Sequence, residues 1–283
     1  MNRIFEAETI ISLMPYLNNK TNKKVVIKYG GAAMIDNNLT VKVIEDIAIL
    51  SLLGFNITLV HGGGPMINQW LQKIKIEPKF EDGVRITDVE TMEVVQMVLA
   101  GKVNKNLVDL FKQYNLQAVG ISGQDANLIV PEPMQILSNN RVADIKSVNI
   151  ELLNILLEKN YIPIIAPTAS DHCGVSYNIN ADIVAGRVAS SLKADNLIIL
   201  TDTEGILQDN EDSSSIISHL NLDETSRLID KGIIQGGMLP KVNCCIQALN
   251  NGVKVTRIID GRIPHSLLLS LLSDTTVGSM ISL

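Results

Sequence analysis

Short apolar runs alternate with amphipathic stretches along most of the chain, and this alternation predicts an α/β fold. Apolar runs bounded by glycine or polar residues are typical of buried strands, whereas apolar residues at every third or fourth position are typical of helices. The predicted strands cover residues 25–28, 57–60, 116–122, 161–166, 197–200 and 253–259. The predicted helices cover 39–53, 87–100 (opened by a Thr87–Glu90 capping box), 103–114, 150–159, 180–192, 223–231, 265–272 and a segment after Gly236–Gly237. Such alternation favours a mainly parallel sheet with helices on both faces.

Two regions depart from this alternation. Residues 124–148 mix short β-like runs with prolines and asparagines, which predicts a hairpin region on one face, and residues 81–85 are expected to be a polar loop. Residues 3–17 have helical apolar spacing, and polar residues 18–24 follow as a linker. That helix packs either on its own domain or on another subunit. We expect residues 1–22 to form this helix and linker, and residues 23–283 to form the main domain.

Two strands end in glycine-rich turns, Val25–Met34 (VVIKYGGAAM) and Asn56–Pro65 (NITLVHGGGP). The backbone N–H groups of such turns are uncovered and bind anions, above all phosphates. Lys28 closes the first apolar run, and a buried lysine is costly unless an anion meets it. Pro65 suits a first helical turn, which places Gly62–Gly64 at a helix N-terminus. The alternative is a tight turn with a lysine that reaches solvent.

Known glycine-rich signatures do not fit the second turn. An esterase oxyanion hole would need a G-x-S-x-G nucleophile elbow, and the sequence has none. The spacing of a dinucleotide fingerprint and a Walker A motif are also absent. The pattern therefore predicts an anion-binding turn outside these nucleotide-binding classes.

Three further motifs carry candidate chemistry. Lys241 in GGMLPK stands in the first turn of a helix, where a cation is unfavourable unless it shares an anion with the helix N-terminus. Asp182 in Asn178-Ile-Asn-Ala-Asp could hold lysines in place, although the cluster also suits an N-cap. Arg85, after Gly83, is a natural fork for a carboxylate, or else a solvated loop arginine.

Composition narrows the classes of function. The chain has 283 residues, a net charge of −6 and only 4% aromatic residues, which argues against nucleic acid and anionic membranes as partners. The three cysteines show no pairing pattern, and the four histidines share no metal-ligand spacing, so we expect neither disulfides nor a protein-made metal site. We expect no transmembrane segment, signal peptide or transit peptide. The Cys244–Cys245 pair is interpreted as core packing.

The set IKYGG, LVHGGGP, DGVRIT, NxNAD, ILTDTEGIL, GGMLPKV and IIDGRIPHSLLLSLL resembles the acetylglutamate kinases, a group within the amino-acid kinase family, in order and spacing over essentially the whole chain. The resemblance implies a three-layer αβα sandwich around a mainly parallel open sheet of about eight strands. It also implies an acetylglutamate-binding lobe at 23–170 and an ATP-binding lobe at 171–283. The expected activity is phosphorylation of the γ-carboxylate of N-acetyl-L-glutamate by ATP with Mg²⁺ in arginine synthesis.

The resemblance assigns roles to individual residues. The implied catalytic residues are Lys28, Lys241 and Asp182. The implied substrate-binding residues are Gly63, Gly64, Arg85 and Asn178. The implied ATP- and phosphate-binding residues are Gly30, Gly31, Gly62, Thr201, Asp202 and Gly237, with Mg²⁺ held by the nucleotide.

The N-terminal helix and the C-terminal segment are similar to the arginine-inhibited, hexameric branch, with the nitrogen-signalling protein PII as a candidate partner. Two positions depart from that branch: Ser270 replaces a glutamate, and Thr276-Val-Gly-Ser replaces GIGT. The alternatives are a carbamate, aspartate or glutamate kinase of the same fold, or a non-catalytic arginine- or nucleotide-sensing subunit. Richness in Ile, Asn and Lys suits an AT-rich genome, so the expected location is the cytoplasm, or the plastid stroma if the gene is organellar.

Overall fold

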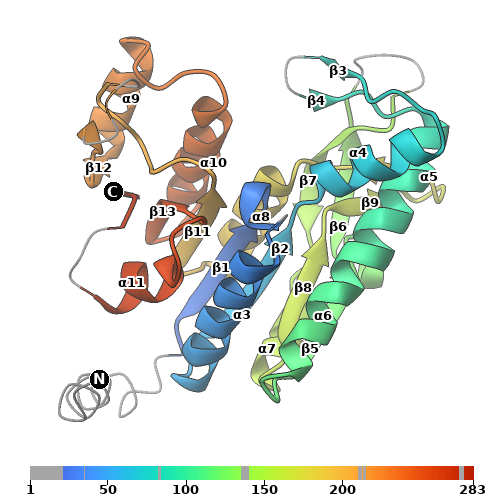
Figure 1. Ribbon diagram of the computed structural model, residues 1–283, viewed down its shortest axis with the longest axis horizontal. Coiled ribbons are helices and arrows are strands. Elements are labelled where there is room, and N and C mark those ends of the chain that lie inside the picture. Colours follow the sequence, from blue (N-terminus) through green and yellow to red (C-terminus); the bar gives the residue numbers. More distant parts are fainter. Residues whose placement is uncertain are drawn as a thin grey trace.

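The computed structural model describes residues 22–34, 36–81, 84–134, 140–209, 212, 215–273 and 277–283. Eight strands form one open sheet, with helices on both sides (Figure 1). Every neighbouring pair is parallel except β13 and β14. In sheet order the strands are β12 (His219–Asn221), β14 (Ser279–Ser282), β13 (Val255–Asp260), β11 (Asn196–Thr201), β1 (Lys24–Tyr29), β2 (Asn56–His61), β8 (Ile162–Ala166) and β5 (Ala118–Ser122).

Two hydrophobic cores, one on each face of the sheet, hold the layers together. Within β1, Val25 and Ile27 belong to one core and Val26 to the other, as the two-residue period of a strand requires. The helices of one face are α3 (Asn37–Leu52), α4 (Gly64–Lys73), α5 (Val89–Gln96), α6 (Asn104–Lys112) and α11 (Ser266–Leu272). The other face carries α7 (Glu151–Glu158), α8 (Ala181–Leu192), α9 (Leu222–Asp230) and α10 (Met238–Asn250). The predicted αβα sandwich is confirmed.

In the described part of the chain, three antiparallel hairpins lie outside this sheet. They are β3 (Phe80–Glu81) with β4 (Val84–Arg85), β6 (Ile129–Pro133) with β7 (Ala143–Val148), and β9 (Thr168–Ser170) with β10 (Ser176–Asn178). The expected hairpin within 124–148 is confirmed. The polar stretch 81–85 is not a plain loop, because Phe80 pairs with Arg85 across β3 and β4.

The predicted capping box at Thr87 is wrong by one residue. Asp88 is the N-cap of α5, and its carboxylate accepts the Thr91 N–H at 2.8 Å. Thr87 is instead fully buried, and its hydroxyl donates to the Arg85 carbonyl. The two helices expected on either side of Gly101 are also continuous, because a π-helical segment, η2 (Met97–Val103), joins α5 to α6.

The shorter helical elements are η1 (Gly31–Met34) and η3 (Asp125–Asn127). The predicted N-terminal helix at 3–17 lies outside the described residues. Among the described helices, none is long and apolar enough to cross a membrane. In the sheet, the strands of residues 23–170 fill one half and those of 171–283 fill the other. Their functional division into two lobes stays a prediction.

Candidate functional site

A cavity of about 350 Å³ opens where β1 and β2 end. In open α/β sheets, ligands bind beyond the carboxyl ends of the strands. The residues expected at the site that line this cavity are Lys28, Gly30, Gly31, Gly62, Gly63, Gly64, Arg85, Asn178 and Asp182. The structure therefore brings together groups from four separate stretches of sequence.

The first glycine turn makes room for a cation. A Cβ atom on Gly30 would lie 2.9 Å from the Lys28 Nζ atom, so a side chain there would displace the ammonium. Gly31 has φ of +72°, a left-handed conformation that favours glycine, and its Cβ position faces the backbone of Asp202 at 4.0 Å. The turn after β1 thus lies beside the end of β11.

Lys28 and Asp182 form an ion pair across two elements. The Lys28 Nζ atom at the end of β1 lies 3.0 Å from Asp182 Oδ1 in the first turn of α8, and each side chain is 12% exposed. Asn180 caps α8 by accepting the Asp182 N–H at 2.8 Å. The N-cap interpretation of this cluster is thus confirmed, with Asn180 as the cap. The ammonium is held at the cavity, where it can meet a negatively charged oxygen.

Arg85 is a buried cation without an acidic partner among the described residues. Its Nη2 atom donates to Asn68 Oδ1 at 2.6 Å and to the Gly64 carbonyl at 3.4 Å, while its guanidinium lies 4.7 Å from the Phe80 ring. Within the described chain, the buried Nη1 atom has no hydrogen-bond partner. Burial lowers the pKa of Arg85. An unpaired buried guanidinium nitrogen is costly, and a bound carboxylate would satisfy it.

The second glycine turn provides the positive end of a helix. Gly63 is the N-cap of α4, and Pro65 follows in the first turn, as the sequence predicts. The Gly62 N–H donates to the Tyr29 carbonyl at 2.7 Å and is thus already used. Among the described residues, no acceptor is seen for the N–H of Gly63 or Gly64. These two amides are the available donors of the turn.

Asn178 completes the cavity from β10. Its side-chain nitrogen donates to the Thr87 hydroxyl at 3.3 Å, and its backbone N–H donates to the Arg141 carbonyl. Thr87, which the sequence placed at a helix start, instead links this amide to the Arg85 backbone. The Asn178 amide is therefore held close to β4, the strand that carries Arg85.

Lys241, Gly237, Thr201 and Asp202 do not line the cavity. The Lys241 ammonium donates to the Gly237 carbonyl at 3.0 Å. However, Cys244, one turn further along α10, donates its thiol to the Asp182 carbonyl at 3.0 Å, so this face of α10 packs on the start of α8. Thr201 and Asp202 lie where β11 ends, next to the first glycine turn. The roles of these four residues stay predictions.

The cysteine pair in α10 is buried core, as interpreted from the sequence. Burial raises the pKa of Cys245 to about 12, which makes it a poor nucleophile. The described residues contain no group of three or more potential metal ligands.

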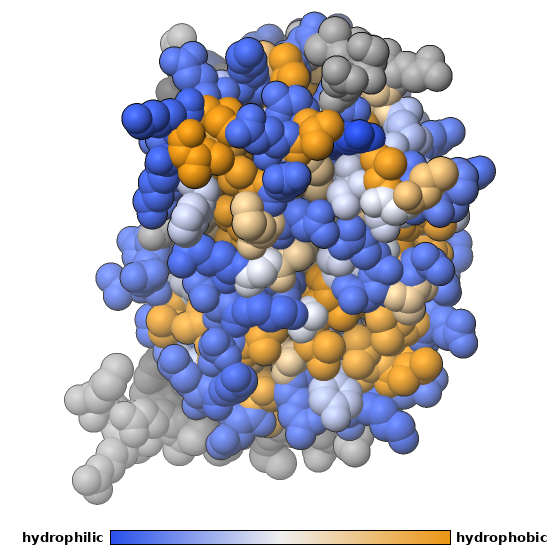
Figure 2. Space-filling view, turned by 90° about the vertical axis from the view of Figure 1, so that its right-hand side faces the viewer, coloured by the Kyte–Doolittle hydropathy of each residue, from blue (hydrophilic) through white to orange (hydrophobic). Residues whose placement is uncertain are grey.

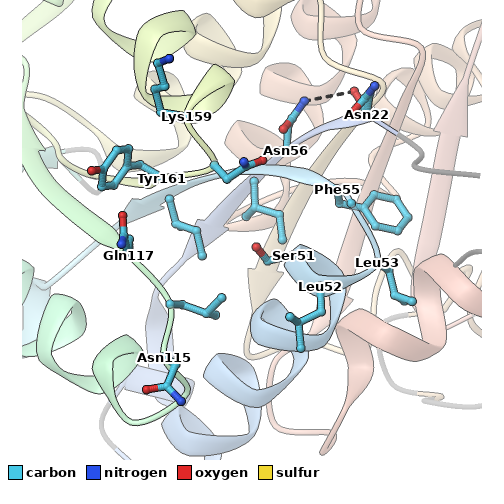
Figure 3. Close-up of a pocket in the computed structure, with 15 residues that line it drawn as sticks. Asn22, Ser51, Leu52, Leu53, Phe55, Asn56, Asn115, Gln117, Lys159 and Tyr161 are labelled. Carbon is cyan, nitrogen blue, oxygen red and sulfur yellow. Dashed lines mark hydrogen bonds between the residues drawn. The ribbon is translucent and has the colours of Figure 1, made fainter.

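A second cavity of about 600 Å³ lies at the opposite end of the sheet, where the helices α3, α6 and α7 end (Figure 3). It contains amide side chains and Lys159 but none of the expected site residues.

The sequence did not point to Asn68 and Phe80, which both contact the Arg85 guanidinium. A signal for Asn68 was present, because it follows Gly64 by four residues on a predicted helix and so shares its face. The contact of Phe80 depends on the β3–β4 pairing, in a stretch for which the sequence predicts a polar loop.

Comparison with known proteins agrees with this fold. Residues 23–260 match the model of the amino acid kinase family. A protein of Trichodesmium erythraeum (strain IMS101) named acetylglutamate kinase is 50% identical over 268 residues, which cover 95% of this chain and 92% of that protein. An acetylglutamate kinase of the red alga Gracilaria tenuistipitata var. liui is 47% identical, with both chains fully covered.

Two solved structures share the fold at low sequence identity. An N-acetylglutamate synthase from Neisseria gonorrhoeae, complexed with coenzyme A and N-acetyl-glutamate, superposes with a TM-score of 0.84 at 22% identity; the match covers 98% of this chain and 63% of that one. A carbamate kinase from Giardia lamblia bound to AMP-PNP gives 0.68 at 17% identity, covering 93% and 99%. Together with the family match, these findings lead to one conclusion: the chain belongs to the amino acid kinase family.

Proposed function

We propose that this chain is an acetylglutamate kinase, which transfers the γ-phosphoryl group of ATP to the γ-carboxylate of N-acetyl-L-glutamate and forms N-acetyl-L-glutamyl 5-phosphate for arginine synthesis. The observation that carries this proposal is the unpaired, buried guanidinium nitrogen of Arg85 in the same cavity as the Lys28–Asp182 pair. Relatives at 46–50% identity bear the name of this activity.

The acceptor chemistry suits the residues of the cavity. A carboxylate is already ionised at neutral pH, so the acceptor needs no general base. Arg85 would bind the α-carboxylate of acetylglutamate, with Asn178 and Gly64 beside it. Two parallel hydrogen bonds from a guanidinium fix the orientation of a carboxylate better than a single ammonium does.

The phosphoryl group needs positioning and compensation of negative charge. Lys28 and the free N–H groups of Gly63 and Gly64 are available for this in the cavity. We propose that Lys241 completes the set when ATP is bound, and that Asp182 holds both lysines. Mg²⁺ would bind to the nucleotide phosphates and neutralise part of their charge.

We further propose that residues 23–170 bind acetylglutamate and residues 171–283 bind ATP. Thr201 and Asp202 at the end of β11, with Gly30, Gly31 and Gly237, would contact the nucleotide. The sheet supports this division, because β1 pairs with β2 on one side and with β11 on the other. Donor and acceptor would therefore bind at the ends of adjacent strands.

The test is ATP- and Mg²⁺-dependent formation of an acyl phosphate, trapped as the hydroxamate with hydroxylamine. We expect product with N-acetyl-L-glutamate and little with glutamate or aspartate, which carry a free ammonium in place of the acetamide. Carbamate is assayed separately by ADP release. A preference for carbamate, aspartate or glutamate would replace the proposed substrate, and no turnover with any acceptor would favour a non-catalytic sensing subunit.

Control and assembly form a second part of the proposal. We propose a homohexamer of three dimers, inhibited by arginine, with PII as a regulatory partner, located in the cytoplasm or in a plastid stroma. Ser270 supports weak inhibition, because a serine has no carboxylate to pair with the guanidinium of arginine. Its hydroxyl already donates to the Leu267 carbonyl within α11. Arginine titration of the acyl-phosphate assay tests the inhibition directly.

A further inference from the structure

His61 lies behind the second glycine turn, on the side away from the cavity. Its side chain is fully buried at the end of β2 and does not line the cavity. The ring Nδ1 atom lies 2.8 Å from the Gly62 carbonyl oxygen. A carbonyl can only accept, so Nδ1 carries the proton and Nε2 is an acceptor. Burial lowers the pKa of His61 to about 4, so the ring is neutral at pH 7.

Asn104 holds the other nitrogen of this ring. It is fully buried at the start of α6, directly after the π-helical segment, and its Nδ2 atom lies 3.2 Å from His61 Nε2. The same Nδ2 atom is 2.9 Å from the Ile164 carbonyl, which identifies it as the donor end of the amide. Gly120 on β5 makes room for the other end, because a Cβ atom there would collide with Asn104 Oδ1.

These contacts fix the orientation of one peptide group. The C=O and N–H of a trans peptide point in opposite directions. The Gly62 carbonyl points to His61, so the N–H of Gly63 points to the other side of the chain, where the glycines line the cavity. That N–H has no acceptor among the described residues.

We propose that His61 and Asn104 are positioning residues, which act in series to aim the Gly63 N–H at the phosphoryl oxygens during transfer. The inference rests on the proposed kinase function. Neither side chain touches the substrates. Their effect is expected in the transition state, where preorganised backbone donors matter most.

Three substitutions separate the parts of this arrangement. His61→Leu removes both ring contacts and should lower kcat by roughly 10- to 100-fold, with both KM values changed less than about twofold. His61→Asn keeps an N–H donor at the δ position and should retain kcat within about fivefold of wild type. Asn104→Ala removes the contact at Nε2, so that the ring is held at Nδ1 alone, and it should give an intermediate loss of kcat.

Thr58→Val is the matched control. Thr58 is buried in the same strand, and its hydroxyl has no partner among the described residues, so this isosteric change should leave kcat unaltered. Thermal unfolding of every variant identifies any that do not fold. If His61→Leu keeps wild-type kcat, or loses activity only through KM, the inference is overturned.

A binding measurement separates this inference from the proposed function. In protein labelled with ¹⁵N-glycine, the Gly63 amide resonance should shift when inorganic phosphate is added to the wild type and to His61→Asn, but not to His61→Leu. Equal shifts in all three would overturn the inference even if the kinase is active. If the wild type makes no acyl phosphate, the proposed function fails, and the pattern of amide shifts still decides whether His61 positions this donor.

Discussion

The two cations of the cavity differ in what surrounds them. Lys28 has Asp182 at 3.0 Å, whereas the partners of the Arg85 guanidinium among the described residues are neutral oxygens and an aromatic ring. A buried charge without a counter-ion favours an anionic ligand more strongly than a charge that is already paired. We therefore expect Arg85 to contribute mainly to substrate binding. We expect Lys28 to contribute mainly to catalysis.

Arg85→Lys should raise KM for acetylglutamate at least tenfold and leave KM for ATP nearly unchanged. A lysine keeps the positive charge but cannot make paired hydrogen bonds to a carboxylate. Steady-state kinetics with each substrate varied in turn measures the effect. Arg187→Lys is the control, because Arg187 donates to the Ile145 carbonyl away from the cavity. A mutant impaired mainly in ATP binding would assign Arg85 to the nucleotide instead.

Lys28→Ala and Lys241→Ala should each lower kcat by roughly 10²–10³, the scale of losing one preorganised charge-stabilising donor. Single-turnover assays with saturating substrates measure the step directly. Lys254→Ala serves as the control, since Lys254 pairs with Asp195 and its side chain is 72% exposed. Near-normal turnover in either active-site mutant would show that its ammonium has no part in the transition state.

His61 should make the protein sensitive to acid. Its pKa is lowered to about 4 by burial, so between pH 6.5 and 4 the unfolded chain binds a proton that the folded chain does not. The stabilising contribution is complete above pH 6.5 and falls by up to roughly 3 kcal/mol as pH drops to 4. Urea unfolding across this range should show a smaller decrease for His61→Asn than for wild type. Parallel pH profiles would contradict the buried, neutral state.

At the residue scale, sequence and structure agree where chemistry is local. Glycine turns after apolar strands predicted Gly30, Gly31 and Gly62–Gly64 at one site, and all of them line the cavity. The contacts of Arg85 with Asn68 and Phe80 depend on tertiary packing between α4 and the β3–β4 hairpin, which no local pattern encodes. The helix start was predicted one residue early because Thr87 and Asp88 are both good N-cap residues, and the fold uses Asp88.

Among the elements, α11 is docked by one buried carboxylate. Asp46 on α3 is 1% exposed, and its Oδ1 atom lies 2.6 Å from the Nδ1 atom of His265. His265 is the N-cap residue of α11, so Asp46 binds the side chain at the start of this short helix. The contact joins an early helix to one of the last.

Asp46→Ala should cost about 1–3 kcal/mol of stability, because the hydrogen bond between Asp46 and His265 is lost. Asp46→Asn tests the charge separately. Burial raises the pKa of Asp46, so its folded state holds the proton more tightly and stability falls as pH rises from about 4. Urea unfolding should show that Asp46→Asn removes this fall. If Asp46→Asn has the same pH profile of stability as wild type, burial does not raise the pKa of Asp46.

Long periodic elements were predicted well and the shortest strands of the sheet were not. The predicted positions of α3 and α8 agree with the structure, because each has a continuous apolar face and a polar N-cap residue. The strands β12 and β14 have only three and four residues, which is too short for a period-two pattern to stand out in the sequence. The π-helical segment was missed because Gly101 resembles a helix end in sequence.

For the whole molecule, the predicted hexamer requires surfaces that subunits can cover. β5 is an edge strand of the described sheet, and apolar patches gather between polar side chains on that side of the molecule (Figure 2). Met97 and Val89 on the adjoining helical segments are 65% and 52% exposed. Unpaired strand edges and exposed apolar side chains are features that oligomers bury.

We predict that deleting residues 1–20 converts hexamers into active dimers. The apolar positions within these twenty residues should pack on the same positions of another subunit across a two-fold axis. Light scattering of full-length and truncated protein measures the assembly. If the full-length chain is a dimer, the hexamer prediction is wrong.

Arginine should inhibit the full-length chain and not the truncated one, because arginine can inhibit only by binding one arrangement of the subunits better than another. Ser270→Glu should strengthen that inhibition.

The three hairpins outside the main sheet have an evolutionary consequence. Arg85 and Asn178, the proposed acceptor ligands, lie on β4 and β10, whereas Lys28 and the glycine turns belong to the sheet itself. Neighbouring strands of a sheet are about 4.8 Å apart, so the spacing of the phosphoryl-transfer groups at the strand ends is set by the framework and not by the hairpins. Exchange of a hairpin can therefore create a new acceptor pocket without rebuilding the phosphoryl-transfer machinery. One inherited framework can in this way give rise to enzymes for chemically unrelated acceptors.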